Sequence, residues 1–374
     1  MKTRPILINA VILAGIFLLY LTIYLSQSKR NHFYNADDHR FYFTGRFDTS
    51  EKKVKKAWDP GVCIEFMFKG SFCDLVVEDE HRHYNKNNVL VVVVDGQKPQ
   101  RIRLNSGHNQ LKIAKGLSKV AHKVLICKAT ESYIGSIKFL GVWCKDLVKY
   151  KRNKKLLFEF IGDSMTCGSG ADSKPEKPSG DNWTDLENAY VSFGPVLSRR
   201  YNAKWMLSSV SGIGLMKSFT ESDKNMPEMY QYTSLDEYSE EWMFDKQQEP
   251  DLVFITLGQN DGIQKPEKFI STYVDFVKFV RSKFPHSRII CCSSPMAQPN
   301  LRIHLNKCIP QVVSRVRRGG DKRIYSYCFK DVYNSGHKSH PSKAEHLRIA
   351  DELQQFLKSK GWNTEQSLLD QRIH

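Results

Sequence analysis

The chain has 374 residues, of which 41% are hydrophobic and 11% aromatic, enough apolar material for one large domain or two ordinary ones. This composition excludes an intrinsically disordered chain, a collagen and a low-complexity repeat. Lys and Arg together number 56 against 40 Asp and Glu, so the formal net charge is +16. Such a balance is typical of proteins that meet nucleic acid, an anionic membrane surface or an acidic substrate.

An apolar segment runs from Ile6 to Leu25, with Asn9 and Thr22 as its polar exceptions. About 20 apolar residues are enough to cross a ~30 Å hydrocarbon core as a helix. No small-x-small cleavage motif follows, which favours an uncleaved signal anchor over a cleaved signal peptide or a buried helix. A single N-terminal anchor usually leaves the following domain outside the cytosol. We therefore predict a single-pass membrane protein with its folded region on the lumenal or extracellular side, secreted if the segment is cleaved, and no nucleic-acid partner.

Nine cysteines follow this segment, and no two of them have CxxC spacing, so the sequence gives little support to a zinc site and predicts no metal. The odd count leaves at least one thiol unpaired within the monomer, and the disulfide connectivity is not readable. Cys291 and Cys292 lie in an apolar run and are interpreted as buried small hydrophobic residues. Asn182-Trp183-Thr184 is a glycosylation sequon for a eukaryotic secretory compartment.

Short strands rich in β-branched and aromatic residues are predicted over residues 38–147. Asp95-Gly96 is a strong hairpin signal directly after the apolar run Val89–Val94. Strands at this spacing, without helical patterns between them, predict a β-sandwich of the jelly-roll type. The predicted strands are Arg40–Phe47, Val62–Phe68, Asp74–Glu78, Val89–Val94, Gln100–Leu104, Val124–Cys127 and Ser136–Trp143.

After Lys155 apolar strands alternate with helical patterns, the clearest of which are Pro266–Phe284 and Ala344–Lys360. This alternation predicts a parallel sheet with helices on both faces, a three-layer α/β/α sandwich. The predicted strands are Leu156–Ile161, Trp205–Val210, Asp251–Leu257, Arg288–Cys292 and Arg323–Cys328. The predicted organisation is a short flank at 1–5, a transmembrane anchor at 6–25, a stem at 26–37, the β-sandwich at 38–147, a basic linker at 148–155, the α/β domain at 156–362 and a tail at 363–374.

Ligand sites in parallel sheets gather at the carboxyl ends of strands. We therefore take as candidate site residues those that follow three of these strands and one that precedes the last helix. Ser164 lies at a strand-to-helix corner, where its hydroxyl could serve as a nucleophile, although such a serine is more often a helix cap. Gly212 could present its backbone N–H to a substrate without interference from a Cβ. Asn260 could donate its side-chain amide, and His340 could act as a general base.

Taken together, the blocks FIGDSMTCGSG, SVSGIGL, ITLGQND and SHPSKAEH resemble the SGNH, or GDSL-type, hydrolase superfamily. The β-sandwich ahead of them and the segments VVVDG, KATE and MPEMY are similar to carbohydrate esterase family 2, which includes acetyl xylan esterases. This resemblance implies a serine esterase that removes acetyl groups from carbohydrate hydroxyls and needs no metal or organic cofactor. It implies Ser164 and His340 as the catalytic pair, with the backbone N–H groups of Ser164 and Gly212 and the Asn260 side chain as the oxyanion hole.

One position departs from the superfamily pattern. Many SGNH enzymes have an Asp three residues before the histidine, and here that residue is His337. Family 2 includes members with a Ser–His dyad whose imidazole is held by a backbone carbonyl, so we predict a dyad with a carbonyl near Lys338 as the third group. The alternatives that stay open are a glycan O-acyltransferase of the same fold and a catalytically weak carbohydrate-binding protein.

The segment between the second and third blocks, residues 217–248, is rich in aromatic residues. Tyr230 and Trp242 are predicted as candidate substrate contacts, although aromatic residues in such a segment more often cover the core. The residues outside the flanks of the apolar segment still carry a net positive charge. This charge could favour binding to an acidic glycan or to an anionic bilayer surface. The oligomeric state is not readable from the sequence.

Overall fold

The computed structural model describes residues 31–82, 86–153, 155–172, 183–219, 224–245 and 248–370. Within these ranges no helix is both long and apolar enough to span a membrane. The predicted anchor at 6–25 and Asn182 of the sequon lie outside the described residues. The anchor and the lumenal placement therefore stay predictions.

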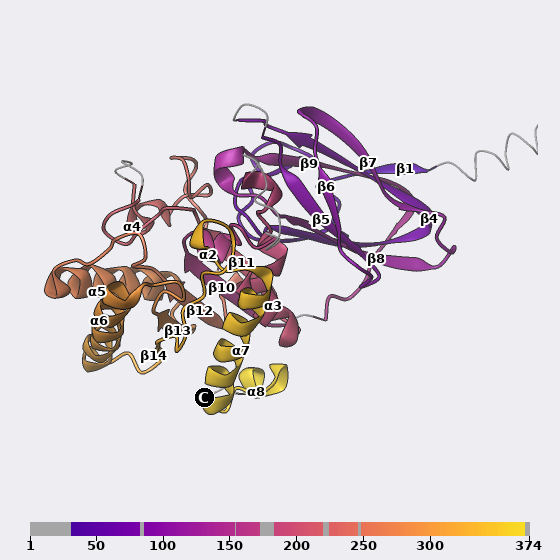
Figure 1. The fold of residues 1–374 in the computed structure, drawn as a ribbon. Helices are drawn as coiled ribbons and strands as arrows, with labels where there is room; N and C mark the ends of the chain where they lie inside the picture. Colours follow the sequence, from indigo (N-terminus) through magenta and orange to yellow (C-terminus); the bar gives the residue numbers. More distant parts are fainter. Residues whose placement is uncertain are drawn as a thin grey trace, which may run out of the picture.

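An antiparallel sheet of nine strands makes up the N-terminal part (Figure 1). Its strands are β1 (His32–Asn35), β2 (Tyr42–Thr44), β3 (Lys55–Ala57), β4 (Cys63–Asp79), β5 (Val89–Val94), β6 (Gln100–Arg103), β7 (Gly107–Lys115), β8 (Ala121–Lys128) and β9 (Ile137–Val148). The long strand β4 unites two predicted strands, pairing with β8 through its first half and with β7 through its second. The predicted β-rich N-terminal domain is confirmed, whereas its jelly-roll topology stays a prediction.

A parallel sheet in the order β11-β10-β12-β13-β14 forms the second part, as predicted. Its strands are β10 (Leu157–Gly162), β11 (Lys204–Ser209), β12 (Leu252–Thr256), β13 (Arg288–Cys292) and β14 (Ile324–Tyr327). The helices are α2 (Ser164–Cys167), α3 (Phe193–Arg200), α4 (Met226–Met229), α5 (Pro266–Lys283), α6 (Pro299–Arg318), α7 (Lys343–Ser359) and α8 (Glu365–Asp370). Helices α5 and α7 match the two predicted helical patterns, while α3 and α6 were not predicted.

Helices cover both faces of this sheet (Figure 1). Side chains alternate between the faces along each strand, because successive residues of a β-strand point in opposite directions. Phe160 and Phe254 stack in the core that includes α3 and α7. Ile161 and Ile255 belong to the core that includes α5 and α6. Burial on both faces explains why these strands are apolar almost throughout.

Strand β5 joins the two parts into one body, because both of its faces are buried. Leu90 and Val92 lie in the core of the β-rich domain. Val89, Val91 and Val93 lie in the same cluster as the α3 and α7 side chains of the α/β domain. The uninterrupted run Val89–Val94 is therefore a strand shared by two cores.

Arg46 of the β-rich domain contacts both the segment that follows α4 and a strand of the α/β domain. This arginine is 1% exposed, and its guanidinium donates to the carbonyls of Tyr230 at 2.7 Å and Tyr232 at 2.5 Å. It also lies 4.0 Å from the buried carboxylate of Glu159. Burial raises the pKa of Glu159 and the Arg46 charge opposes that rise. The buried cation thus satisfies two carbonyls and one carboxylate together.

The predicted basic linker contacts the β-rich domain. Arg152 pairs with the buried Glu65 and donates to Thr44 Oγ1 at 2.7 Å. Tyr42 donates to the Tyr150 carbonyl at 2.6 Å. Arg152 is held against the β-rich domain, because a buried carboxylate there needs a cation beside it.

We expect Arg46→Met to lower the free energy of unfolding by about 3–5 kcal/mol, because it leaves Glu159 without its cation and two carbonyls without a donor. The matched control is Lys138→Met, which removes an exposed pair with Glu51 and should cost about 1 kcal/mol or less. Chemical denaturation of both variants measures the difference. Equal losses for the two would contradict a structural role for Arg46.

Candidate active site

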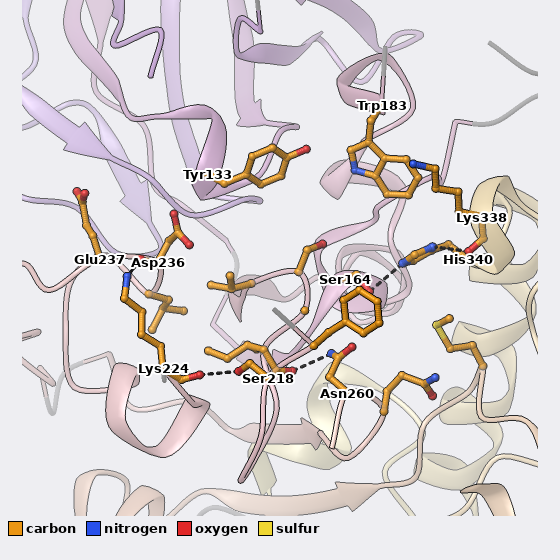
Figure 2. Close-up of a pocket in the computed structure, with 18 of the residues that line it drawn as sticks. Tyr133, Ser164, Trp183, Ser218, Lys224, Asp236, Glu237, Asn260, Lys338 and His340 are labelled. Atoms are coloured by element: carbon orange, nitrogen blue, oxygen red, sulfur yellow. Dashed lines mark hydrogen bonds between the residues drawn. The ribbon is translucent and has the colours of Figure 1, made fainter. Parts of the chain in front are cut away.

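Ser164 is the first residue of α2, directly after the carboxyl end of β10. Asp163 precedes it and caps the helix, since its side chain accepts from Met165 N at 3.2 Å. The Asp163 side chain thus takes the capping role that was the alternative interpretation for Ser164. Ser164 lines a cleft of about 1300 Å³, which leaves its hydroxyl available for chemistry (Figure 2).

His340 meets Ser164 across this cleft. Its Nε2 lies 2.9 Å from Ser164 Oγ, and its Nδ1 lies 3.1 Å from the Lys338 carbonyl oxygen (Figure 2). A carbonyl can only accept, so Nδ1 carries the proton and Nε2 is left to accept from the serine hydroxyl. This is the tautomer that a general base for Ser164 requires.

The backbone before His340 is bent to deliver that carbonyl. Lys338 and Ser339 have φ values of 49° and 58°, in the left-handed region that non-glycine residues rarely adopt. Beyond the bend, Ser342 and Glu345 form a capping box that fixes the start of α7. Such local strain costs of order 1 kcal/mol or more per residue and persists only where the surroundings enforce it.

Burial lowers the pKa of His340 below its ordinary value of 6.5. The Lys338 carbonyl opposes this shift, and the neighbouring His337 ring and Lys338 charge add to it. Trp183 packs edge-on against the His340 ring, with 5.3 Å between the ring centroids. The imidazole is therefore neutral near pH 7, in the form that can take a proton.

Gly212 and Asn260 line the same cleft as Ser164 and His340. Gly212 follows β11 with a φ of 80°, which favours glycine. Asn260 donates from Nδ2 to the Ile213 carbonyl at 2.8 Å and to Asp163 Oδ2 at 3.3 Å. The structure thus brings together all four residues of the sequence blocks, and the longer of the two Asn260 bonds is the one that an oxyanion could replace.

Tyr230 and Trp242 do not lie in this cleft, so their assignment as substrate contacts is corrected. Tyr230 is completely buried and donates from its hydroxyl to Glu159 at 2.8 Å. Trp242 packs over the Arg46 guanidinium, with 5.5 Å between the group and the ring centroid. Both rings surround a buried cation, because an arginine without water needs aromatic faces and carbonyls around it.

Several cleft residues were not singled out from the sequence. Arg82, Lys86 and Tyr133 come from the β-rich domain and form one wall. Trp183 and Lys338 form the wall beside His340 (Figure 2). Nothing in the sequence pointed to the residues of the first wall, because they lie outside the four hydrolase blocks, in a domain predicted only as a β-sandwich.

Metal-ligating residues do not cluster in the parts of the chain that the structure describes, where no group of three or more His, Cys, Asp or Glu could hold an ion. Eight of the nine cysteines are buried, Cys291 and Cys292 included, as predicted for these two. Ser164 and His340 are among the residues that line the cleft.

Family comparisons agree with this arrangement. Residues 43–150 match the N-terminal domain of carbohydrate esterase 2. Residues 160–349, slightly more than half of the chain, match the GDSL-like lipase/acylhydrolase family. The chain belongs to the GDSL-like lipase/acylhydrolase family. The resemblance predicted from the four sequence blocks is confirmed.

Named relatives of this GDSL-family chain are esterases. The cellulase/esterase CelE of Acetivibrio thermocellus is 29% identical over 339 residues, which cover 88% of this chain and 40% of CelE. An acetylxylan esterase/glucomannan deacetylase of Cellvibrio japonicus is 26% identical over 320 residues, covering 80% of this chain and 84% of that enzyme. The chain thus spans less than half of CelE and most of the second relative.

Solved structures show the same two-part architecture. A family two carbohydrate esterase from Clostridium thermocellum, in complex with cellohexaose, matches with a TM-score of 0.78 and 28% identity over 86% of this chain and 99% of that one. A family two carbohydrate esterase from Cellvibrio japonicus shares the fold, with a TM-score of 0.81 and 22% identity over 89% and 98% of the two chains. The predicted class of ester hydrolase is confirmed by the family and by these relatives.

We expect a fluorophosphonate to label Ser164 at a rate that rises with pH through the pKa of His340 and is flat above it, because only the neutral imidazole can take the serine proton. The midpoint should lie below 6.5, since burial lowers this pKa. Labelling followed by mass spectrometry at several pH values measures it, with Ser164→Ala as the unlabelled control. A midpoint at or above 6.5 would contradict the buried, neutral imidazole.

Proposed function

We propose that this protein is a serine esterase that removes acetyl groups from carbohydrate hydroxyls through a Ser–His dyad. The observation that carries the proposal is the pair of hydrogen bonds that joins Lys338 O to His340 Nδ1 and His340 Nε2 to Ser164 Oγ. A carbohydrate-binding protein would need neither bond. We take the proposed substrate class, an acetylated carbohydrate, from the relatives, which are named as carbohydrate and acetylxylan esterases.

The reaction begins when His340 Nε2 takes the proton of Ser164 and Ser164 Oγ attacks the acetyl carbonyl carbon. The carbonyl oxygen becomes an oxyanion beside the backbone N–H groups of Ser164 and Gly212 and the Asn260 amide. The tetrahedral intermediate then expels the sugar oxygen, which takes the proton from His340, and leaves an acetyl-enzyme. Water attacks next, giving its proton to His340, and the return of that proton to Ser164 releases acetate.

A carbonyl can replace the usual aspartate because it performs two of the three tasks of that residue. In Ser-His-Asp enzymes the carboxylate fixes the tautomer, orients the ring and stabilises the imidazolium that forms. The Lys338 carbonyl fixes the tautomer and orients the ring, while its dipole offers less stabilisation than a full negative charge. The lowered pKa of His340 is consistent with this weaker partner.

We expect Ser164→Ala to abolish turnover of an acetylated sugar and of an activated acetate ester, because the variant lacks the hydroxyl that lies 2.9 Å from His340 Nε2. Asn260→Ala should lower kcat about 10²–10³-fold, the usual effect of losing one oxyanion donor. Acetate release measures both, and product analysis with an acceptor sugar separates hydrolysis from acyl transfer.

A matched control for that assay is Ser198→Ala, which removes another buried serine of the same domain. Ser198 Oγ donates to the Gly194 carbonyl at 2.9 Å within its own helix. This variant should keep the activity of the wild type. Full activity of Ser164→Ala would overturn the proposed function.

The charge around the cleft favours an acidic glycan as the substrate. Among the residues that the structure describes, the lining carries four cationic side chains, Arg82, Lys86, Lys224 and Lys338, against the two acids Asp236 and Glu237. Arg82 pairs with both of these acids. Among the described residues no ion pair joins Lys86 or Lys338 to a carboxylate; their ammonium groups lie over the rings of Tyr133 and Trp183, at 5.6 and 5.3 Å from the centroids.

We expect kcat/KM for an acetylated, carboxylate-bearing sugar to fall with ionic strength, because salt screens charges over a Debye length of about 8 Å at 0.15 M. An acetylated neutral sugar is the control and should show a flat profile. Lys86→Met should flatten the profile for the acidic sugar. A salt effect of the same size on both sugars would contradict charge recognition in the cleft.

A further inference from the structure

Glu131 belongs to the β-rich domain by sequence, yet its side chain lies among residues of the α/β domain. It follows β8 and precedes a short 3-10 helix, Ser132–Ile134. The residue is 0% exposed. The catalytic steps described above make no use of it, and a buried carboxylate costs folding free energy unless it is fully hydrogen-bonded.

The Glu131 carboxylate accepts from two serines of the α/β domain. Its Oε2 accepts from Ser211 N at 2.9 Å, and its Oε1 accepts from Ser211 Oγ at 2.6 Å. Ser169 Oγ also donates to Oε1 and lies 3.0 Å from Ser211 Oγ. Three donors therefore converge on one carboxylate. Burial raises the pKa of Glu131, and the hydrogen bonds from Ser169 and Ser211 oppose that rise.

Each of these serines adjoins a group assigned to the oxyanion hole. Ser211 directly precedes Gly212, so the bonds to its N–H and hydroxyl fix one side of the peptide that carries the Gly212 N–H. Ser169 lies in the turn after α2, where its N–H donates to the Ser164 carbonyl at 3.0 Å. One carboxylate thus ties together the two loops that supply backbone donors.

Other buried side chains form hydrogen bonds with the backbone of Glu131. Its own N–H donates to Glu187 Oε2 at 3.1 Å, and Tyr133 of the cleft wall donates to Glu187 Oε1 at 2.5 Å. Lys128 Nζ donates to the Glu131 carbonyl at 3.0 Å. Burial and the Glu131 charge raise the pKa of Glu187 to about 8. The segment from Lys128 to Tyr133 is therefore fixed at its backbone as well as at its carboxylate.

We propose that Glu131 is a positioning residue for the oxyanion hole, so that the β-rich domain completes the active site. The proposal rests on the proposed esterase function. The geometry of Ser211 and Ser169, which the α/β domain does not fix alone, sets the direction of the backbone donors. Because those donors act on the oxyanion and not on the bound sugar, the residue acts on kcat more than on KM.

The test compares three variants with the wild type in an acetate-release assay. Glu131→Ala should lower kcat about tenfold to a hundredfold, less than the ~10²–10³-fold loss of a donor itself, and change KM by about threefold or less. Glu131→Gln should recover most of kcat, because its amide oxygen still accepts from Ser211 N and its NH₂ can donate to the rotatable serine hydroxyls. Glu65→Ala is the matched control, since it removes a buried carboxylate whose ion pairs run to Arg152 and Lys123.

Two readouts separate positioning from stability and from a failure of the proposed function. Thermal unfolding should show Glu65→Ala destabilised while its kcat stays near that of the wild type. Hydrogen exchange of the peptide that spans 209–214 should quicken in Glu131→Ala and not in Glu65→Ala, whether or not the protein turns over an ester. Unchanged exchange, or equal kcat losses in the two alanine variants, would overturn the positioning role. No turnover by the wild type would refute the esterase proposal instead.

Discussion

The packing of β5 between two hydrophobic cores is the constraint on which the rest of the molecule depends. Val89, Val91 and Val93 are buried against the α/β domain while Leu90 and Val92 fill the β-rich domain. Burying one such side chain is worth about 1.5–3 kcal/mol, so parting the domains would cost several kcal/mol for the three valines alone. The cleft walls are consequently held at fixed separation, and residues of the first domain can serve chemistry performed by the second. Trp205 reinforces the contact by donating to the Gly61 carbonyl at 3.0 Å.

A fixed scaffold also explains how strain can be kept beside His340. Two consecutive left-handed residues, Lys338 and Ser339, present a carbonyl where Ser-His-Asp enzymes have a carboxylate. The carbonyl sets the tautomer without bringing a charge into a partly buried site, where an isolated charge would be costly. Compared with a carboxylate, the carbonyl gives less electrostatic stabilisation to the imidazolium. In return, the imidazole stays neutral at lower pH. In the proposed mechanism this balance suits His340, which takes a proton from a hydroxyl and then returns it.

The sequence predicted that Ser164, Gly212, Asn260 and His340 come together, and they line one cleft. The first three follow strands whose ends converge in a parallel sheet, and His340 precedes the last long helix. It misplaced Tyr230 and Trp242 because a run of aromatic residues is as compatible with a buried arginine as with a sugar. The strand Gly107–Lys115 was missed since its pattern is largely polar, and β4 was split in two where its register shifts. The segment KATE, which ends at Glu131, contributed to the family resemblance. The contacts of Glu131 could not be predicted, because its partners lie 38 and 80 residues along the chain and only the fold brings them together.

Asp163 directly precedes Ser164 in the chain, and a negatively charged carboxylate near an oxyanion would oppose its formation. Burial, with the nearby Asp261 and Glu131 charges, raises the pKa of Asp163 to about 7. With a pKa of about 7, Asp163 is partly protonated at neutral pH, and its bond to the Asn260 amide is already long at 3.3 Å. The second hydrogen of Asn260 Nδ2 is therefore weakly held, while the bond to the Ile213 carbonyl keeps the amide aimed at the cleft. In the proposed reaction, the oxyanion that forms on the substrate is a stronger acceptor for that hydrogen than Asp163 is. The proposed donor therefore stands ready in the resting site and is fully engaged only as the negative charge develops.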